Sequence, residues 1–367
     1  MVGSKSPAAP LEVLSLGSAS GHGGDSATPL LEALEGLGAF QVLLPETLAA
    51  ETAEIFALTV CFLDLPGSQK ERFELDPADG SALPNGYHPP GGLGGYNRYR
   101  SGFIFQGRVC WPLLDDEMVA EVLRKRPGLG VSFEDRFVSW RTGIWRWTER
   151  IFSRLLEELE ARELLADELR GGGGDTSFGL FAEGGARDLI AHSQVHIKRT
   201  EGTGTAGEVL LPPHRDPSIL SVVIHLSRDP PGQGLEILDD TAGTFVPVSR
   251  SGCGVATVFA GSLLGKLCNC SGFCAARAIH RVVAPPCGKV GCDRLAATFF
   301  FQPAPDAALT PIVASPEARG QKLAAPYGKL QRRRHARYVR SEQGRSEQGR
   351  SEQGRSEPGA LSRDRVV

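Results

Sequence analysis

The chain has 367 residues, of which 41% are hydrophobic and 23% are charged. This composition is typical of a globular protein and excludes wholesale disorder. The net charge of -3 conceals an uneven distribution, because residues 331–367 contain ten Arg against five acidic residues, which leaves -8 for residues 1–330. An acidic body argues against a nucleic-acid-binding protein, which needs a basic surface for the phosphate backbone.

Both ends of the chain are predicted to be disordered. Residues 1–29 contain one Lys and no continuous apolar segment, so they do not resemble a secretory signal. With eight Cys and no such signal, we expect reduced thiols and a cytoplasmic location. Residues 331–367 repeat SEQGR three times in succession, and a repeat of small and charged residues cannot bury an apolar face. No run of 18 apolar residues occurs, so no membrane contact is expected.

The first half of the body, residues 30–170, has a mainly helical pattern. Apolar spacing predicts, in chain order, a helix over 30–37, a strand over 39–44, a helix over 46–63 and a long helix over 140–169. Gly and Pro are dense between residues 76 and 107. That segment is therefore predicted to be a long ordered loop.

From Gln194 onward the sequence changes to short β-rich runs separated by turns. The predicted strands cover residues 195–197, 219–226, 234–237, 244–247, 255–259, 278–283 and 295–301. No helical pattern of comparable strength interrupts them. Residues 190–305 are therefore predicted to form a β-sandwich or a double-sheet barrel, wrapped by the earlier helices.

Three residues in this β-rich part form a candidate metal site. His214 and Asp216 are two positions apart, so in an extended segment both side chains point the same way. His280 opens a later strand and can complete a set of two imidazoles and one carboxylate. Such a set leaves three adjacent coordination positions open and serves non-haem Fe(II) oxygenases, although catalytic zinc sites can also use it. Arg294, near the last apolar strand, is suited to anchor a carboxylate.

The ordered set of motifs resembles the Fe(II)/2-oxoglutarate oxygenases of the isopenicillin-N-synthase-like family. The resemblance rests on HRDPSILSVVIHL, GLEILD, GSLL, IHRVV and DRLAATFFF, and on GLGAFQVLLPETLAAE near the N-terminus, and it spans about residues 35–303. It implies an α/β protein with a mainly β core: a double-stranded β-helix, or jelly roll, with flanking helices.

The same resemblance implies an enzyme. His214, Asp216 and His280 would bind Fe(2+), and Arg294 would hold the cosubstrate 2-oxoglutarate. The reaction would hydroxylate or desaturate a small organic substrate with O2 and release succinate and CO2. Ascorbate is a candidate reductant.

Two anchors that the family uses for 2-oxoglutarate are absent. Ala296 stands where the family has a Ser two residues after the Arg, and residues 196–200 lack the expected Tyr. We expect Lys198 or Arg199 to replace that hydroxyl. Two alternatives therefore stay open: an Fe(II) oxidase of the same fold that uses no 2-oxoglutarate and grips its substrate with Arg294, or a non-catalytic binding protein.

Several further residue clusters have candidate roles. The Cys cluster over residues 268–292 has two interpretations. It is either a structural zinc site or a group of reduced thiols, and we favour the reduced thiols. Tyr96, Tyr99 and Arg100 are candidates to line a substrate pocket. His225, in the middle of a predicted strand, is predicted to be a core or surface histidine whose hydrogen bonds are satisfied. The Trp residues of the long helix, Trp140, Trp145 and Trp147, are predicted to pack against the core.

Overall fold

A computed structural model describes most of the body of the protein. The described residues are 13–14, 30–74, 86–91, 99–106, 133–166, 194–200, 207–225, 234–248, 252–268, 278–284, 294–303, 309, 311–313 and 327. The disorder predicted for residues 331–367, and for most of residues 1–29, lies outside these ranges. Val13 and Leu14, within the latter stretch, form the short strand β1 beside β2.

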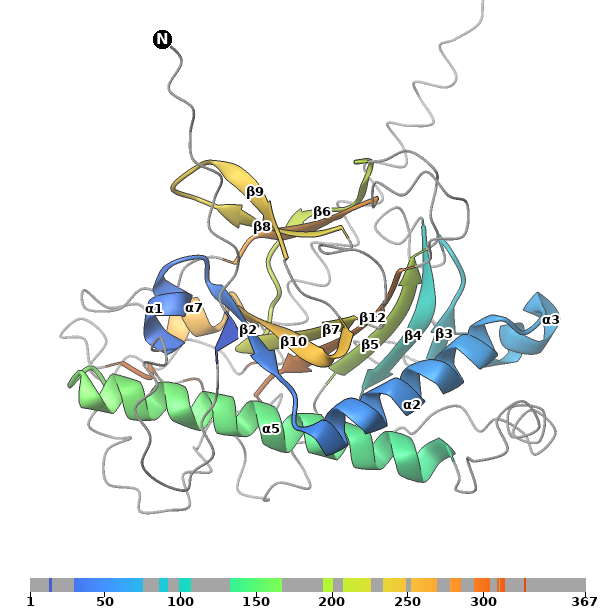
Figure 1. Ribbon diagram of the computed structural model, residues 1–367, viewed down its shortest axis with the longest axis horizontal. Coiled ribbons are helices and arrows are strands. Elements are labelled where there is room, and N and C mark those ends of the chain that lie inside the picture. The colour runs from blue at the N-terminus through green and yellow to red at the C-terminus, as the bar shows by residue number, and fades with distance from the viewer. Residues whose placement is uncertain are drawn as a thin grey trace, which may run out of the picture.

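Two β-sheets face each other, and helices cover the outside of the larger one (Figure 1). The large sheet contains β1 (Val13–Leu14), β2 (Ala39–Leu43), β10 (Gly252–Ala260), β7 (Leu220–His225), β12 (Arg294–Phe301), β5 (Gln194–Thr200), β4 (Arg100–Gln106) and β3 (Gly86–His88), in that spatial order. The small sheet contains β6 (Val209–His214), β11 (His280–Val283), β8 (Leu235–Asp239) and β9 (Thr244–Pro247).

The last eight strands build a double-stranded β-helix. From β5 to β12 the chain passes back and forth between the sheets, so that β5, β12, β7 and β10 are neighbours in one sheet and β6, β11, β8 and β9 in the other. The pairs within this unit are antiparallel. The predicted jelly-roll fold class is therefore confirmed.

The N-terminal part of the chain widens the large sheet at both edges. β2 pairs with β10 at one edge, and β4 pairs with β5 at the other. The prediction of a loop throughout residues 76–107 was therefore wrong for 86–88 and 100–106. Gly102, which lowers β-propensity, is required there, because a Cβ at this position would lie 2.1 Å from the carbonyl oxygen of Ile197. A glycine inside a strand can mark such a close approach of two backbones.

Two long helices, α2 (Glu46–Leu63) and α5 (Phe133–Ala161), lie against the outer face of the large sheet (Figure 1). The predicted bounds of α2 are confirmed, whereas α5 begins seven residues earlier than predicted and ends at Ala161 rather than at residue 169. Glu163 adopts a positive φ of 59°, and the amides of Glu163 and Leu164 bond back to Glu160 and Leu159. This Schellman arrangement ends the helix.

The remaining helical elements are short. They are α1 (Leu30–Glu35), α3 (Gly67–Lys70), the 3-10 turn Glu71–Phe73 and α7 (Leu264–Leu267). None of the described helices combines the length and the apolar character that a membrane crossing requires.

The main hydrophobic core lies between the helices and the outer face of the large sheet. Trp140, Trp145 and Trp147 are buried there, which confirms that they pack against the core. The Trp145 ring lies 4.7 Å from that of Phe301 and 5.9 Å from that of Phe299, measured between centroids. A smaller cluster joins the inner face of the large sheet to the small sheet.

Candidate metal centre and basic inner face

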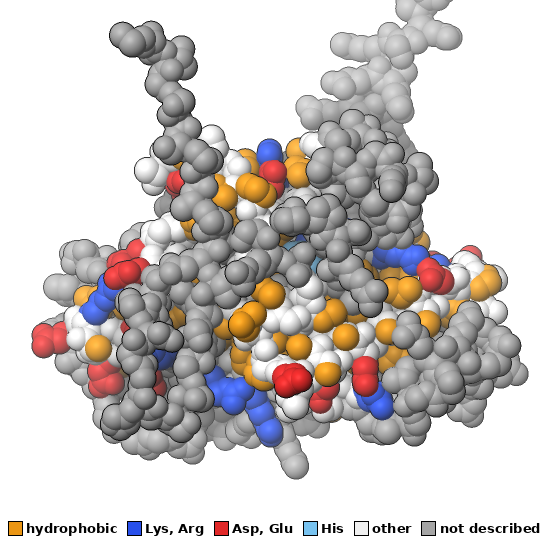
Figure 2. All heavy atoms as spheres, in the orientation of Figure 1, with side chains coloured by type: hydrophobic (Ala, Val, Ile, Leu, Met, Phe, Trp, Pro, Cys, Tyr) orange, Lys and Arg blue, Asp and Glu red, His pale blue; other side chains and the backbone are white. Residues whose placement is uncertain are grey.

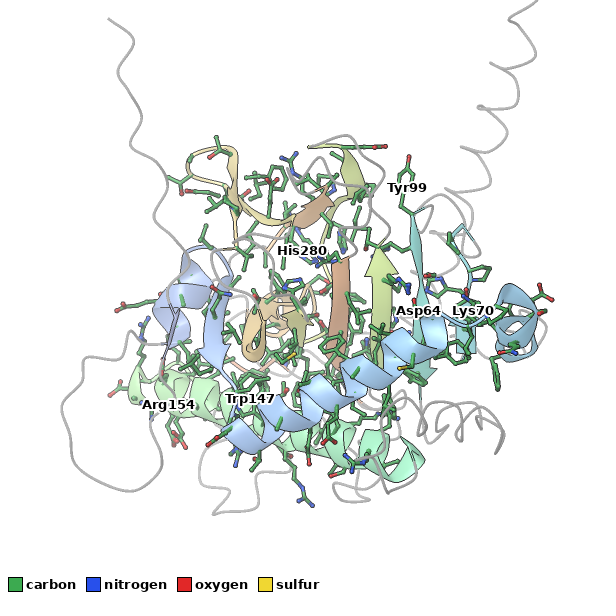
Figure 3. All side chains as sticks on the ribbon, turned by 45° about the vertical axis from the view of Figure 1, so that its right-hand side comes forward. Asp64, Lys70, Tyr99, Trp147, Arg154 and His280 are labelled. Atoms are coloured by element: carbon green, nitrogen blue, oxygen red, sulfur yellow. The ribbon has the colours of Figure 1, made fainter. Side chains whose placement is uncertain are left out.

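The jelly roll brings the three predicted metal ligands together. His214 ends β6, Asp216 follows two residues later, and His280 begins the adjacent strand β11, where it is in register with His214. One ligand atom from each residue lies within 4.8 Å of the others. The Nε2 atoms of His214 and His280 are 3.6 and 3.7 Å from Oδ1 of Asp216. Figure 3 shows His280 between the two sheets.

Backbone carbonyl groups fix the orientation of both imidazoles. The Nδ1 atom of His214 lies 2.9 Å from the carbonyl oxygen of Pro212, and that of His280 lies 3.1 Å from the carbonyl oxygen of Ala278. Because a carbonyl can only accept, Nδ1 carries the proton in each ring and Nε2 presents a lone pair. This is the usual support of a metal-binding histidine.

The carboxylate of Asp216 also fits a metal ligand. Asp216 is 6% exposed, and its Oδ2 atom is buried without a hydrogen-bond partner in the described structure. A buried carboxylate oxygen is costly unless a hydrogen bond or a metal compensates it. The donor set, two imidazole nitrogens and one carboxylate, therefore fits Fe(II) in both geometry and chemistry.

Burial keeps His214 neutral. It lowers the pKa of His214 to about 4, with a further contribution from His280. The imidazole is thus ready to donate its lone pair at neutral pH. The His280 ring stacks on Phe259 at 4.5 Å, whereas the side chain of His214 is 22% exposed. Histidine atoms are visible between the two sheets in Figure 2.

The loop that carries Asp216 is fixed to the turn after β10. The amides of Ser262, Leu263 and Gly261 donate to the carbonyl groups of Asp216, Ser218 and Ile219, at 2.8–3.1 Å. A Cβ on Gly261 would lie 1.8 Å from the Ser218 carbonyl oxygen. Glycine at the start of the GSLL sequence therefore permits a contact that holds a metal ligand in place.

The side chains of the large sheet alternate between two environments. Phe259, Val223 and Ala296 pack in one cluster with residues of the small sheet, so their side of the sheet is called the inner face here. Residues directly opposite on neighbouring strands share a face. The register therefore assigns the following residues to the inner face: His88, Arg100, His196, Lys198, Thr200, His225 and Arg294.

Arg294 occupies the inner face with His225 beside it. Its Nη2 atom lies 2.6 Å from Nε2 of His225. The guanidinium group donates, because burial and the charge of Arg294 keep the pKa of His225 well below its usual value. Burial, with a contribution from Arg100, lowers the pKa of Arg294 to about 9, so it is cationic at neutral pH. His225 is thus a buried histidine with a hydrogen-bond partner, as predicted, but the sequence did not indicate that the partner is Arg294.

Lys198 and Arg199, the two residues expected to replace the missing Tyr, lie on opposite faces of the large sheet. Lys198 faces inward, opposite Ala296 and Gly102 on the neighbouring strands. Burial first and Arg100 second lower its pKa well below the usual value. Arg199 points to the outer face and forms an ion pair with Asp64 at the end of α2 (Figure 3). Only Lys198 of this pair therefore faces the same side as the triad.

Thr200 and His88 were not identified as site residues from the sequence. Thr200 is 1% exposed and lies between Arg100 and Arg294 across the sheet. Several buried polar atoms have no hydrogen-bond partner in the described structure. Five of them belong to the triad or to the inner face: they lie in His88, His196, Thr200, Asp216 and Arg294. Buried polar atoms of native proteins are normally satisfied, so this concentration indicates a site for a polar ligand.

The remaining sequence candidates are only partly described. Tyr99 donates a hydrogen bond to Glu208 at 2.9 Å, which connects the start of β4 with the stretch before β6 (Figure 3). Tyr96 lies outside the described residues. Cys268 is buried. The other members of the predicted Cys cluster, residues 270, 274, 287 and 292, lie outside the described ranges.

Comparison with known proteins gives matches in structure only. No protein-family model and no curated protein matches the chain. A full-length Neurospora crassa protein, crystallised in complex with alpha-KG and 5-formyluracil, matches with a TM-score of 0.61 and 15% identity, over 83% of this chain and 88% of the other. The rice dioxygenase for auxin oxidation matches with a TM-score of 0.54 and 22% identity, over 89% and 95%.

The chain has the fold of the 2-oxoglutarate and Fe(II) oxygenases. The resemblance seen in the sequence is thereby confirmed for the fold. At these identities the match carries the arrangement of strands and helices, and the chemistry has to be argued from the site itself.

Proposed function

We propose that the protein is a non-haem Fe(II)- and 2-oxoglutarate-dependent dioxygenase that hydroxylates or desaturates a small organic substrate and releases succinate and CO2. One observation carries the proposal: the ligand atoms of His214, Asp216 and His280 converge within 4.8 Å in a jelly roll whose inner face also presents Arg294. A metal site and a buried carboxylate receptor are the two parts that this reaction needs.

His214, Asp216 and His280 would hold the metal. When bound, Fe(II) with 2-oxoglutarate activates O2 and supplies the oxidising chemistry, while the protein supplies binding and orientation. The two Nδ1–carbonyl contacts keep the imidazoles turned toward Asp216. Phe259 covers one side of His280 and keeps water away from that ring.

Arg294 would bind the distal carboxylate of 2-oxoglutarate. Its guanidinium group can donate two parallel hydrogen bonds to a carboxylate, and burial strengthens each of them because the local dielectric is low. His225 holds the guanidinium in one orientation through the 2.6 Å contact. The buried Thr200 hydroxyl, opposite Arg294, offers the hydroxyl that Tyr and Ser supply elsewhere in the family.

Small organic molecules are the expected substrates. The N. crassa structure contains alpha-KG and 5-formyluracil, and the rice protein is named for the oxidation of auxin. These ligands belong to the matched proteins, but they support a small-molecule substrate for this chain as well. The unit formed by residues 30–170 and 190–305 would act as one catalytic body, since both parts contribute strands to the large sheet.

The proposal is tested by anaerobic purification, addition of Fe(II), and measurement of succinate formed from 2-oxoglutarate in the presence of O2. We expect succinate from the wild type and a decrease of at least about 100-fold for Asp216→Ala, because loss of a ligand costs more than loss of a supporting contact. Asp240→Ala, which removes an exposed carboxylate at the end of β8, is the matched control. Absence of both Fe(II) binding and succinate in the wild type would refute the proposal.

A second function is favoured by one observation. Ala296 lies opposite Lys198, where the family has a Ser for the cosubstrate, so Arg294 could instead hold the carboxylate of the substrate in an Fe(II) oxidase. In that case the wild type binds Fe(II) with the affinity expected of the triad but forms no succinate from 2-oxoglutarate. The same experiment therefore separates the two functions.

A further inference from the structure

His88 lies on the inner face at one edge of the large sheet. It is the last residue of β3, is 1% exposed, and lies opposite Gly102 of β4. Gly102 in turn lies opposite Lys198 of β5. Neighbouring strands lie about 4.8 Å apart, which separates the Cα atoms of His88 and Lys198 by about 10 Å. Because Gly102 carries no side chain, a ligand group can lie beside His88 in this row without displacing a side chain of β4.

The ring of His88 presents a hydrogen-bond acceptor. Its Nδ1 atom lies 3.4 Å from the carbonyl oxygen of Pro89. A carbonyl can only accept, so Nδ1 carries the proton and Nε2 carries the lone pair. Nε2 is buried and, within the part of the chain that the structure describes, has no hydrogen-bond partner. Burial, with Lys198 second, lowers the pKa of His88 to about 3, so the lone pair is available at neutral pH.

A second ring nitrogen lies in the adjoining row of the same face. His196 precedes Lys198 by two residues on β5 and lies opposite Ile104 of β4. Its Nε2 atom is also buried without a hydrogen-bond partner among the described residues, and its ring meets that of Phe300 edge on, at 4.9 Å between centroids. Burial first, then the charges of Lys198 and His88, lower the pKa of His196 well below its usual value. Two neutral imidazoles therefore present ring nitrogens to the same region.

The proposed cosubstrate cannot satisfy the acceptor of His88. 2-Oxoglutarate is a dianion at neutral pH, and its carboxylates and keto group accept hydrogen bonds but donate none. Its proposed anchor, Arg294, lies in a different row, opposite Thr200. A buried acceptor without a donor costs free energy, so a second ligand with an N–H or O–H group is indicated. An ordered water molecule is the competing donor, and an analogue that lacks the N–H or O–H distinguishes the two.

We propose that Nε2 of His88 accepts a hydrogen bond from an N–H or O–H group of the substrate, with His196 as a second polar contact. The substrates would then be small organic molecules that carry such a donor, as cyclic amides, imides and phenols do. The inference rests on the proposed dioxygenase function and extends it to a substrate class. A site built to accept a hydrogen bond rejects an analogue that lacks the donor, because the buried acceptor is then left unpaired.

The test is a binding experiment that does not depend on turnover. The protein is loaded with Mn(II) and a saturating amount of N-oxalylglycine, an unreactive analogue of 2-oxoglutarate. It is then titrated with three matched pairs: 2-pyridone and N-methyl-2-pyridone, succinimide and N-methylsuccinimide, phenol and anisole. Binding is followed by calorimetry. In at least one pair we expect the wild type to bind the donor at least about tenfold more tightly than its methylated partner.

Variants assign this preference to His88. His88→Phe keeps a planar ring without nitrogen and should bind both members of the pair with Kd values within about twofold of each other. His88→Gln can accept through its amide oxygen and should keep part of the preference. Tyr87→Phe removes a hydroxyl from the outer face of the same strand. It is the matched control and should bind as the wild type does. Circular dichroism of each variant verifies folding.

A measurement on the wild type replaces His88→Phe if that variant does not fold. Nitrogen-15 NMR of histidine-labelled protein detects the unprotonated ring nitrogen of His88, with His88→Gln to assign the signal. This signal should move upfield when the donor of the preferred pair is added and should stay in place with the methylated partner. A signal that responds equally to both would contradict a hydrogen bond from the ligand to His88.

The outcomes separate this inference from the proposed function. A wild type that binds neither Mn(II) nor N-oxalylglycine contradicts the dioxygenase function. A wild type that binds both, but prefers the donor in none of the three pairs, overturns the inference alone, and so does a preference that His88→Phe retains. A loss of N-oxalylglycine affinity in His88→Phe as large as that in Arg294→Met would overturn it too, because His88 would then belong to the cosubstrate site.

Discussion

The two faces of the large sheet are made by the same strands, but in part of the sheet the inner face carries buried basic side chains, whereas the outer face there is apolar. On β12, Leu295, Phe299 and Phe301 face outward into the helix-covered core, whereas Arg294 and Ala296 face the small sheet. On β5, Ile197 faces outward and Lys198 inward. Alternate residues of one strand therefore serve stability and binding separately.

This division explains how the protein can keep several basic side chains buried on one face. The outer face buries large apolar side chains against α2 and α5, and each of these contributes stability. The inner face contains buried Arg and Lys side chains, whose transfer out of water costs free energy. A change on the outer face should therefore lower stability and spare ligand binding, whereas a change of a ligand-binding residue on the inner face should weaken that binding.

The largest effect is expected on the outer face. Trp145→Ala removes a fully buried ring that packs on Phe301 and Phe299, so it should lower the free energy of unfolding by about 3–5 kcal/mol. Urea unfolding measures this loss. The affinity of the remaining folded protein for N-oxalylglycine at low temperature should stay within about twofold of the wild type; a tenfold decrease would contradict the separation of the two faces.

Arg294→Met should weaken ligand binding rather than folding, and by less free energy than Trp145→Ala removes from stability. The variant loses a charged hydrogen-bond donor to the cosubstrate, worth about 1.5–3 kcal/mol, so the Kd for N-oxalylglycine should rise by about tenfold to a hundredfold. Calorimetric titration of the Mn(II)-loaded protein checks this. An unchanged Kd would mean that Arg294 serves another ligand, as in the oxidase alternative.

The inner face should also make stability depend on pH. Burial, with Lys198 second, lowers the pKa of His88 to about 3. Below pH 6.5 the unfolded state therefore takes up a proton that the folded state does not, so this contribution to stability is complete above pH 6.5 and is lost as the pH falls toward 3. The slope is about 1.4 kcal/mol per pH unit for one such group.

His88→Gln tests this dependence. Urea unfolding of the metal-free protein between about pH 6.5 and about pH 4 should show a slope that is shallower by about one proton than that of the wild type. A mutation of the outer face such as Trp145→Ala should shift the whole curve without changing its slope. An identical slope in His88→Gln and wild type would show that His88 is protonated equally in the folded and unfolded states.

The smallest change in stability is expected for a substitution on the exposed side of α5. Arg154 forms ion pairs with Glu157 at 3.1 Å and with Glu158 at 3.4 Å (Figure 3). Because the Arg154 side chain is 58% exposed, Arg154→Ala should change the free energy of unfolding by less than about 1 kcal/mol and should leave binding unaltered. A larger loss would show that this surface contributes to stability more than exposed ion pairs usually do.

The local strand pattern predicted a β-sandwich or a double-sheet barrel, and the resemblance to the oxygenase family specified the jelly roll and the convergence of the three candidate ligands. Residues two apart in an extended segment point the same way, which was enough to place His214 beside Asp216. The strand over residues 244–247 and the helix over 46–63 were predicted with the observed bounds. The role proposed for His280 depended on the ordered set of motifs around it rather than on spacing alone.

The composition of the inner face could not be predicted in the same way, since it depends on which strands become neighbours. Arg100 and Thr200 are far apart in the sequence and meet only because β4 pairs with β5. β4 itself was hidden by Gly102, a residue that disfavours strands but is needed for the close approach to Ile197. His225 lies within the HRDPSILSVVIHL motif, but no spacing rule assigned it a partner, and only its contact with Arg294 reveals its place.

The backbone contacts between the Asp216 loop and the turn after β10 have a consequence for metal uptake. Because three amides hold this loop and carbonyl groups hold both imidazoles, the ligands are arranged before the metal arrives. Binding should then require little loss of chain entropy. We expect the far-ultraviolet circular dichroism to change little on metal addition, and metal uptake to be limited by the dehydration of the ion rather than by folding.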